Sequence, residues 1–319
     1  AVFAEEIVSL ARADERIVAI TAAMQQPVGL QPLADAMPER VIDVGIAEQH
    51  ALTAAAGMAY AGLHPVVALY ATFLNRAFDQ VLMDVGLHGA GVTIVLDRAG
   101  LTGTDGASHN GMWDMALFCL VPGLRLAAPR DERTLREALR TAVGVDDGPT
   151  IVRYPKGALP APLPAVRTVG DDDEGPFGAV DILLEAAGEG AGGPLLLVGV
   201  GAMVPATLEA GRALVARGEA VTVACPRWVV PVPRALVDLA ASARGVVVVE
   251  DGLVEGGVGS RLRDALEDGA TGGGARPVVA RVGVPRRFVA TAERSQLLAD
   301  FGMDAAGIER TALGLGRRS

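Results

Sequence analysis

Acidic, basic and imidazole side chains gather just after short apolar runs of this sequence, where they could act together on a ligand. Glu48 follows the run 41–44, and it could exchange a proton with a ligand, as His109 could. Asp105 lies four residues before His109 in a glycine-rich segment, so both side chains could face a polar substrate. Arginine recognises phosphate through paired N–H donors. A phosphate site is therefore predicted from three arginines at or near the ends of apolar runs, namely Arg76, Arg98 and Arg153.

Each of these positions also has a plain structural interpretation. Glu48 could simply begin a helix, because the helix dipole favours an acidic residue in the first turn. The segment 101–111 could be a flexible surface loop, and an isolated arginine is usually solvated. Tyr70 and Phe73 are more often core aromatics than a platform for a ligand. The pattern alone leaves both interpretations open at every position.

The elements that must hold these residues alternate between strand and helix. Strands that alternate with helices predict a mostly parallel sheet with helices on both faces. Ligands of such sheets bind at the carboxyl ends of the strands, where the polar residues above are found. In the first half, apolar runs predict strands at 17–22, 41–44, 66–70, 92–96, 125–128 and 150–154. Helices are predicted over 1–16, 51–61 and 72–87, with a further one from Asp131.

A second alternation of strands and helices follows a break rich in Pro, Gly and Asp. The break predicts a linker at 161–178 between a first domain at 1–160 and a second domain at 179–319. The fold class expected is α/β, with two doubly wound domains, the second of them smaller. Strands are predicted at 195–200, 220–224, 246–250 and 277–282, and helices at 204–217, 233–243 and 257–267.

Composition limits the class of protein. The formal net charge is −10, which argues against a general nucleic-acid binder because such a protein needs a basic surface. The two cysteines, Cys119 and Cys225, are far apart and form no disulfide framework or metal-type cluster. No apolar run is long enough for a membrane span, and no signal peptide opens the chain. We therefore expect a soluble, cytoplasmic protein without nucleic-acid or membrane partners.

Several segments in a fixed order resemble the 1-deoxy-D-xylulose-5-phosphate synthase family. The combination of these segments in this order is specific to the family, although no single segment would be. The resemblance extends over essentially the whole chain, and it includes 249–251 and 302–304 in the second half. The segments that carry it are 41–51 (VIDVGIAEQHA), 70–80 (YATFLNRAFDQ), 97–100 (DRAG), 105–111 (DGASHNG) and 153–157 (RYPKG).

The resemblance implies a thiamine-diphosphate pyrimidine-binding domain followed by a transketolase C-terminal-type domain. It implies that Glu48 hydrogen-bonds the ring nitrogen of the cofactor's aminopyrimidine, that Phe73 stacks on this ring, and that Ile46 also contacts the cofactor. The substrates implied are pyruvate and D-glyceraldehyde 3-phosphate, and His109 is a candidate for proton transfer. Asp105 and His109 match residues that contact the substrates. The positions that match residues around the acceptor's phosphate are Tyr70, Arg76, Arg98 and Arg153.

The resemblance also implies parts that this chain does not contain. The family needs an N-terminal domain whose Gly-Asp-Gly stretch binds Mg²⁺, which holds the cofactor's diphosphate. No Gly-Asp-Gly occurs in the sequence, so we assign no metal ligand here. We expect a missing N-terminal domain or a companion polypeptide to supply these groups, a homodimer to form, and the chain alone to be weak or inactive.

Two other interpretations remain open. The chain could be the β-type subunit of a 2-oxo acid dehydrogenase or of a split transketolase, since such subunits have this size and these two domains. It could instead be a non-catalytic dimerisation or regulatory module that kept the fold and lost the reaction.

Overall fold

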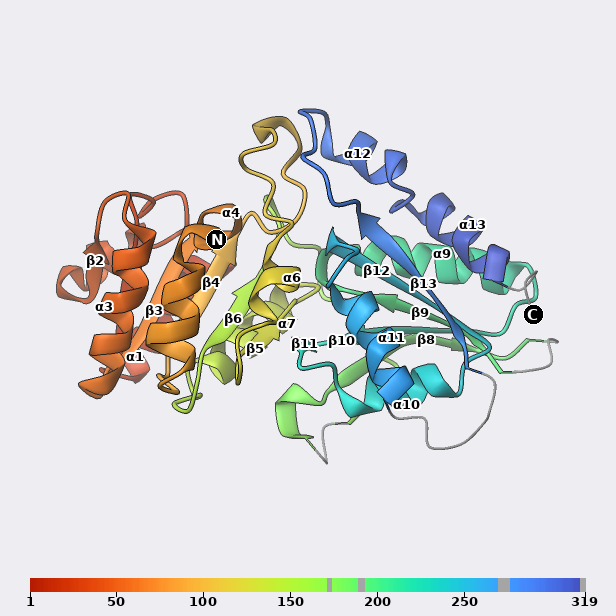
Figure 1. Ribbon diagram of the computed structural model, residues 1–319, viewed down its shortest axis with the longest axis horizontal. Helices are drawn as coiled ribbons and strands as arrows, with labels where there is room; N and C mark the ends of the chain where they lie inside the picture. Colours follow the sequence, from red (N-terminus) through yellow and green to blue (C-terminus); the bar gives the residue numbers. More distant parts are fainter. Residues whose placement is uncertain (171–173, 189–192, 269–275, 316–319) are drawn as a thin grey trace.

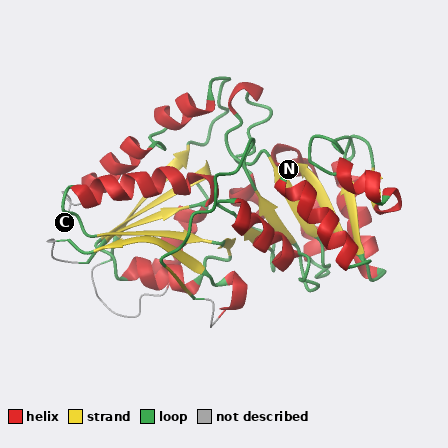
Figure 2. Ribbon diagram, turned by 180° about the vertical axis from the view of Figure 1, so that it is seen from behind, coloured by secondary structure: helices red, strands yellow, loops and turns green. Residues whose placement is uncertain are grey.

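The structure is a computed structural model that describes residues 1–170, 174–188, 193–268 and 276–315 (Figure 1). Within these residues the strands form two sheets, one of seven strands and one of six. The two sheets lie in different halves of the molecule, each between layers of helices (Figure 2). This arrangement confirms the predicted α/β class built on two sheets.

The first sheet has the strand order β11-β5-β6-β4-β3-β1-β2. All neighbours are parallel except β11 and β5, so the carboxyl ends of the other strands meet at one edge. Its middle strands are fully buried and rich in Val, Ile and Leu, as expected for a sheet covered on both faces. The strands are β1 (Ile17–Thr21), β2 (Val41–Asp43), β3 (His64–Tyr70), β4 (Thr93–Asp97), β5 (Arg125–Ala127), β6 (Thr150–Arg153) and β11 (Trp228–Val230).

The helices of the first half begin close to where the sequence predicts them, with one exception. The segment 72–87, predicted as one helix, is divided into four short helices of different pitch. Leu74, Ala77, Val81 and Val85 are nevertheless fully buried against the core, as on one face of a regular helix. The helices are α1 (Val2–Ala13), α2 (Gln31–Ala36), α3 (Glu48–Tyr60), α6 (Asp114–Phe118) and α7 (Glu132–Ala142), and the divided segment comprises α4 (Ala71–Leu74), η2 (Asn75–Ala77), α5 (Phe78–Gln80) and η3 (Val81–Gly86).

The second sheet has the order β13-β12-β9-β10-β8-β7. Its strands are β7 (Arg167–Val169), β8 (Val180–Ala186), β9 (Leu195–Gly199), β10 (Val221–Pro226), β12 (Gly245–Leu253) and β13 (Val278–Val284). In Figure 1, α9 and α13 cover one face and α10 and α11 the other. The helices are α9 (Val204–Ala216), α10 (Arg234–Ala241), α11 (Val258–Asp268), α12 (Arg294–Asp300) and α13 (Ala305–Leu315).

Two strands do not follow the predicted division of the chain into two domains joined by a linker. Strand β7 lies inside the segment 161–178, where we expected only a connection, and it pairs antiparallel with β8 in the second sheet. Strand β11 comes from the second half of the chain but completes the first sheet beside β5. Both strands are only three residues long, which is too short for a clear pattern of alternation in the sequence.

A buried ion-pair network joins the two halves of the chain. Arg130 is fully buried, and its Nη1 donates to Asp181 Oδ2 on β8 at 2.5 Å. Arg227 donates to the same carboxylate through Nη2 and Nε, at 2.8 and 3.0 Å. The remaining N–H groups of Arg130 reach the carbonyl oxygen of Leu163. The Asp181 carboxylate therefore pairs with two arginines. Asp131, whose Oδ2 lies 3.4 Å from Arg130 Nε, caps helix α7 by accepting from Thr134 N.

His64 begins β3 and is fully buried. Its Nε2 lies 2.9 Å from Thr93 Oγ1, and its Nδ1 lies 3.3 Å from Asp146 Oδ1. Burial lowers the pKa of this imidazole, although Asp146 opposes the shift. The folded protein therefore holds His64 neutral at a pH where the unfolded chain would bind a proton.

We expect the free energy of unfolding to fall below pH 6.5 because of His64. The unfolded state takes up a proton near the ordinary histidine pKa of about 6.5, so stability is lost by up to about 1.4 kcal/mol per pH unit until the folded pKa is reached. Urea unfolding of wild type and His64→Gln between pH 7.5 and 5 measures this slope. The slope should be shallower in His64→Gln than in the wild type, whereas His88→Gln, at an exposed position, should keep the wild-type slope. Equal slopes in all three proteins would contradict the assignment.

Candidate active site at the strand ends of the first sheet

The predicted site residues follow strands that are neighbours in the first sheet. Tyr70 and Asp97 end β3 and β4 and are paired in register, while Thr21 and Asp43 are paired at the ends of β1 and β2. The loops after these strands therefore share one edge, where the sequence analysis expected a ligand to bind. Loop 101–111, which follows β4, carries Asp105 and His109 to the same edge.

Glu48 is the first residue of α3 and is only 2% exposed. Its Oε2 has no hydrogen-bond partner, and the nearest cation is Arg76, whose Nη1 lies 3.8 Å away. A buried acceptor without a partner costs about 1–3 kcal/mol, so such an atom usually awaits a donor from a ligand. The dipole of α3 accounts for an acidic residue at this position, but it leaves the unpaired oxygen unexplained.

Glu48 lines a cavity of about 280 Å³. One wall is the backbone of 22–24, where Ala23 has the unusual φ of +57°. Asp43 holds this backbone in place, because its Oδ1 accepts from Ala23 N at 2.7 Å and from Gly45 N at 2.9 Å. The sequence analysis missed both 22–24 and Asp43; a carboxylate at the end of β2 was the available signal. The other lining residues are Ile46, Glu48, Phe73 and Arg76.

Phe73 connects this cavity to the rest of the site. Its ring stacks on Tyr70 with centroids 5.8 Å apart and an interplanar angle of 13°. On another side it meets the His109 ring edge to face, at 5.7 Å and 71°. Loop 101–111 is further held here by Thr72, whose Oγ1 donates to Ser108 O at 3.0 Å. Phe73 therefore contacts both the Tyr70 ring and the imidazole of His109.

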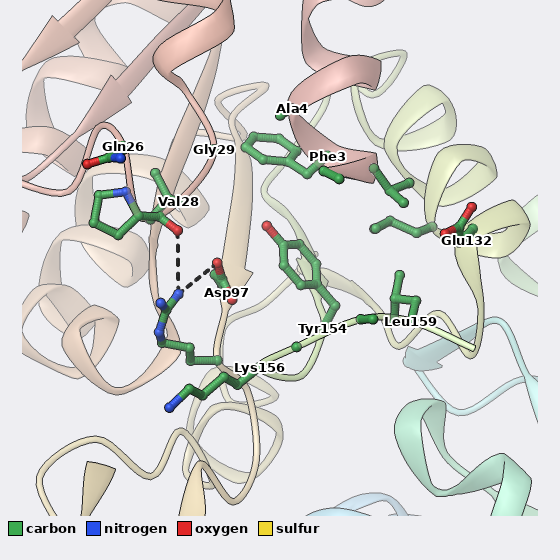
Figure 3. A pocket seen from close by; sticks show the side chains of 17 residues that line it. Phe3, Ala4, Gln26, Val28, Gly29, Asp97, Glu132, Tyr154, Lys156 and Leu159 are labelled. Carbon is green, nitrogen blue, oxygen red and sulfur yellow. Dashed lines mark hydrogen bonds and ion pairs between the residues drawn. The ribbon is translucent and has the colours of Figure 1, made fainter. Parts of the chain in front are cut away.

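Arg98 and Lys156 bring two cations to a second cavity of about 370 Å³ beside Tyr70 (Figure 3). The Arg98 guanidinium lies 3.9 Å above the Tyr70 ring centroid and donates to Asp97 Oδ2 at 2.9 Å. The Arg98 backbone has φ of +59°, which costs energy for a residue with a side chain. Lys156 Nζ lies 2.6 Å from Asp105 Oδ1. The sequence analysis did not select Lys156, although it stands three residues beyond the end of β6.

Buried oxygen atoms face the same cavity. Burial raises the pKa of the Asp97 carboxyl, although the guanidinium of Arg98 opposes the shift. Burial also raises the pKa of the Tyr154 hydroxyl well above its usual value. In Figure 3, Asp97 borders the space from the end of β4, and Tyr154 and Lys156 border it from the segment that follows β6. The cavity thus combines two cations with oxygen atoms that can form hydrogen bonds, beside apolar side chains such as Phe3 and Leu159. Its polar part is suited to an anionic, hydroxylated ligand.

The prediction for Arg153 needs a correction. Its side chain is 3% exposed and lies between the two sheets, where Nε donates to Asp114 Oδ2 at 2.6 Å and Nη2 to Asp251 O at 2.9 Å. These partners occupy the guanidinium, so it is not available to a phosphate. The side chains alternate along a strand, and the last residue of β6 faces the interior instead of the ligand edge.

Residues 1–162 match the family model described as the transketolase pyrimidine-binding domain, and residues 185–308 match the transketolase C-terminal domain. The chain belongs to the transketolase pyrimidine-binding family. The first match covers all the site residues named above, and the second covers most of the second sheet.

Two curated relatives of this transketolase-family chain are 1-deoxy-D-xylulose-5-phosphate synthase of Kocuria rhizophila and 1-deoxy-D-xylulose-5-phosphate synthase 2 of Streptomyces coelicolor. Each is 53% identical over 98% of this chain, which corresponds to 46% and 47% of the relative's own length. The chain therefore spans about half the length of the curated relatives it matches.

Solved structures of transketolases share the fold of this family member. A split-gene transketolase, described as an inactive beta4 tetramer, matches with a TM-score of 0.81 and 27% identity, covering 98% of this chain and 96% of its own. Transketolase from Campylobacter jejuni matches with a TM-score of 0.78 and 17% identity, covering 98% of this chain and 46% of its own. The second likeness shows the fold alone.

The first cavity fits the ring that the family name implies. An aminopyrimidine is flat and carries a ring nitrogen and an amino group. The cavity offers an unpaired carboxyl oxygen, the Phe73 ring and the apolar side chains of Met24 and Ile46. Among the residues that the structure describes, no three His, Cys, Asp or Glu side chains are grouped as metal ligands, and no helix is long and apolar enough to cross a membrane.

Proposed function

We propose that this chain is the pyrimidine-binding and C-terminal part of a thiamine-diphosphate-dependent 1-deoxy-D-xylulose-5-phosphate synthase. Such an enzyme decarboxylates pyruvate and joins the remaining two-carbon unit to D-glyceraldehyde 3-phosphate. The observation that carries the proposal is the buried, unpaired Oε2 of Glu48 beside the Phe73 ring. The names of relatives with 53% identity support this synthase as the activity.

In this proposal, Glu48 would share a proton with the ring nitrogen of the aminopyrimidine, and Phe73 would stack on that ring. Ile46, which lines the same cavity and is 77% exposed, would also contact the ring. Thiamine diphosphate, when bound, supplies the nucleophilic carbon and the electron sink of the reaction. Mg²⁺ and its ligands would come from a segment outside this chain that carries the Gly-Asp-Gly stretch.

The acceptor's phosphate would be bound by Arg98 and Lys156, with Tyr70 and Arg76 at the sides of the site. Asp105 and His109 would contact the substrates, and His109 would move a proton to or from a substrate oxygen. Water would be excluded by loop 101–111, whose tip lies over Phe73. We further propose domains at 1–160 and 179–319, a homodimer, and a cytoplasmic location.

The test is an assay of the full-length protein with pyruvate, glyceraldehyde 3-phosphate, thiamine diphosphate and Mg²⁺. We expect release of carbon dioxide with formation of one pentulose phosphate per turnover. Activity with a ketose phosphate donor and no pyruvate would identify a transketolase, which is the second candidate because of the split-gene likeness. Dependence on a lipoyl acceptor would indicate a 2-oxo acid dehydrogenase, and no turnover with any donor would indicate a non-catalytic module.

We expect Arg98→Gln to raise the KM for glyceraldehyde 3-phosphate by about 10- to 100-fold, because a charged hydrogen bond to phosphate is lost. The KM for pyruvate should change by less than about threefold, since pyruvate carries no phosphate. Steady-state kinetics with each substrate varied in turn separates the two effects. Arg16→Gln, at the opposite edge of the sheet and 45% exposed, is the matched control. Equal changes in both KM values would argue against a phosphate contact.

A further inference from the structure

The base of loop 101–111 is held by side chains from the second half of the chain. Leu101 N donates to Asp251 Oδ1 at 2.9 Å, and Arg294 Nε donates to Leu101 O at 3.0 Å. Arg294 Nη2 closes the ring by donating to Asp251 Oδ2 at 2.6 Å. One carboxylate and one guanidinium therefore satisfy both polar groups of a single peptide residue, and Leu101 is fully buried.

The other end of the loop is fixed in the same way. Asn110 is fully buried, and its Oδ1 accepts from Thr102 N at 2.9 Å. Its Nδ2 donates to Val289 O at 3.4 Å, which again belongs to the second half. Gly100 N also donates to Gly111 O at 2.8 Å, so the two ends of the loop are tied to each other.

At two glycines, the loop lies so close to the second half that no side chain would fit. Gly100 has φ of +78°, and a Cβ there would overlap the carboxylate of Asp251. Gly103 has φ of +77°, and a Cβ there would come within 3.0 Å of Arg294 N. Figures 1 and 2 both show the loop beside the segment that leads into α12. The loop thus lies directly against the second half along its base.

The tip of the loop contacts the first half through three side-chain interactions, and Gly106 in the tip lies against Thr291 of the second half. Asp105 pairs with Lys156, Ser108 O accepts from Thr72, and the His109 ring lies against Phe73. The tip is partly exposed, whereas the base is buried and tied at both ends. The position of Asp105 and His109 over the site therefore depends on where the base is held.

We propose that Asp251 and Arg294 are positioning residues that set loop 101–111 over the active site. In this arrangement the second half of the chain takes part in the reaction by fixing Asp105 and His109, and it touches neither substrate nor cofactor. The catalytic part of this inference rests on the proposed synthase function, but the clamp itself does not. Arg294 is suited to an experiment because it is 31% exposed, so its substitution should leave the fold intact.

The test compares Arg294→Gln with wild type in the full-length protein. We expect amide hydrogen exchange in 101–111 to become about 10- to 100-fold faster, because two charge-assisted hydrogen bonds are lost. We expect kcat to fall by about 10- to 100-fold while the Kd for thiamine diphosphate stays within about twofold, because the loop is misplaced and the Glu48 cavity is untouched. Arg294→Lys, which keeps the charge beside Asp251, should recover part of both effects.

Arg217→Gln is the matched control, since it removes an ion pair to Glu309 from the second half without touching the loop. Unchanged exchange in 101–111, or equally faster exchange across the whole second half, would overturn the inference. Faster exchange confined to 101–111 in a protein without synthase turnover would leave the clamp standing and overturn the proposed function.

Discussion

Glu48→Gln should lower the synthase turnover of the full-length protein by about 10²–10⁴-fold at saturating cofactor, the range typical of a lost proton-transfer group. The amide is nearly the same size as the carboxyl and stays in the same cavity. It cannot take up or release a proton at the ring nitrogen. The effect should therefore appear in kcat more than in the KM for either substrate.

The stability of the same variant separates a functional role from a structural one. Glu48 Oε2 has no hydrogen bond, and its one ion pair, with Arg76, is long and half exposed. Replacing the carboxyl should therefore change the free energy of unfolding by less than about 1 kcal/mol. Steady-state turnover and urea unfolding of the same preparation measure both quantities.

Glu39→Gln is the control, because Glu39 is exposed in the short helix η1 (Pro38–Arg40) before β2. It should keep wild-type turnover and wild-type stability. Turnover of Glu48→Gln within about threefold of wild type would remove Glu48 from the mechanism. A large loss of stability in that variant would point to a structural carboxyl instead.

Asp181→Asn should lower the free energy of unfolding by about 3–5 kcal/mol, the usual cost of breaking a buried ion pair from one side. The carboxylate is fully buried and balances Arg130 and Arg227 together. The asparagine has nearly the same shape, so the loss would come from the charge and not from a cavity. Arg130 would keep only the longer contact between its Nε and Asp131 Oδ2, at 3.4 Å.

Urea unfolding of Asp181→Asn and Glu185→Gln gives the comparison on one strand. Glu185 also pairs with an arginine, Arg167, but both side chains are more than 40% exposed. An exposed pair of this kind contributes about 0–1 kcal/mol. Similar losses of unfolding free energy in the two variants would show that burial does not make the Asp181 ion pairs more stabilising than an exposed pair.

Most of the fold could be predicted from sequence because it depends on apolar runs that are long enough to recognise. Strands such as β4 and β9 lie within one residue of their predicted bounds. The divided helix over 71–86 and the three-residue strands β7 and β11 could not be predicted, because packing against distant residues decides them. Local sequence carries no information on such partners.

The site residues could also be predicted only where local sequence determines their position. Glu48, Tyr70, Phe73, Arg98, Asp105 and His109 gather as expected, because they follow parallel strands that end at one edge. Arg153 was assigned to a phosphate, yet its partners Asp114 and Asp251 come from distant segments. The direction in which a side chain leaves the last residue of a strand is set by the register of the sheet. Lys156 was missed because a single lysine in a loop has no pattern of its own.

Strand β11 means that the boundary between the two halves is not a single point in the chain. Trp228–Val230 completes the first sheet at its β5 edge, and the Trp228 ring packs edge to face on Phe177 at 4.9 Å. A fragment that ends in the segment 161–178 would therefore carry a sheet with an open edge, where unpaired backbone groups favour aggregation. Any dissection, domain exchange or fusion of this protein must treat residues 228–230 as belonging to the first sheet.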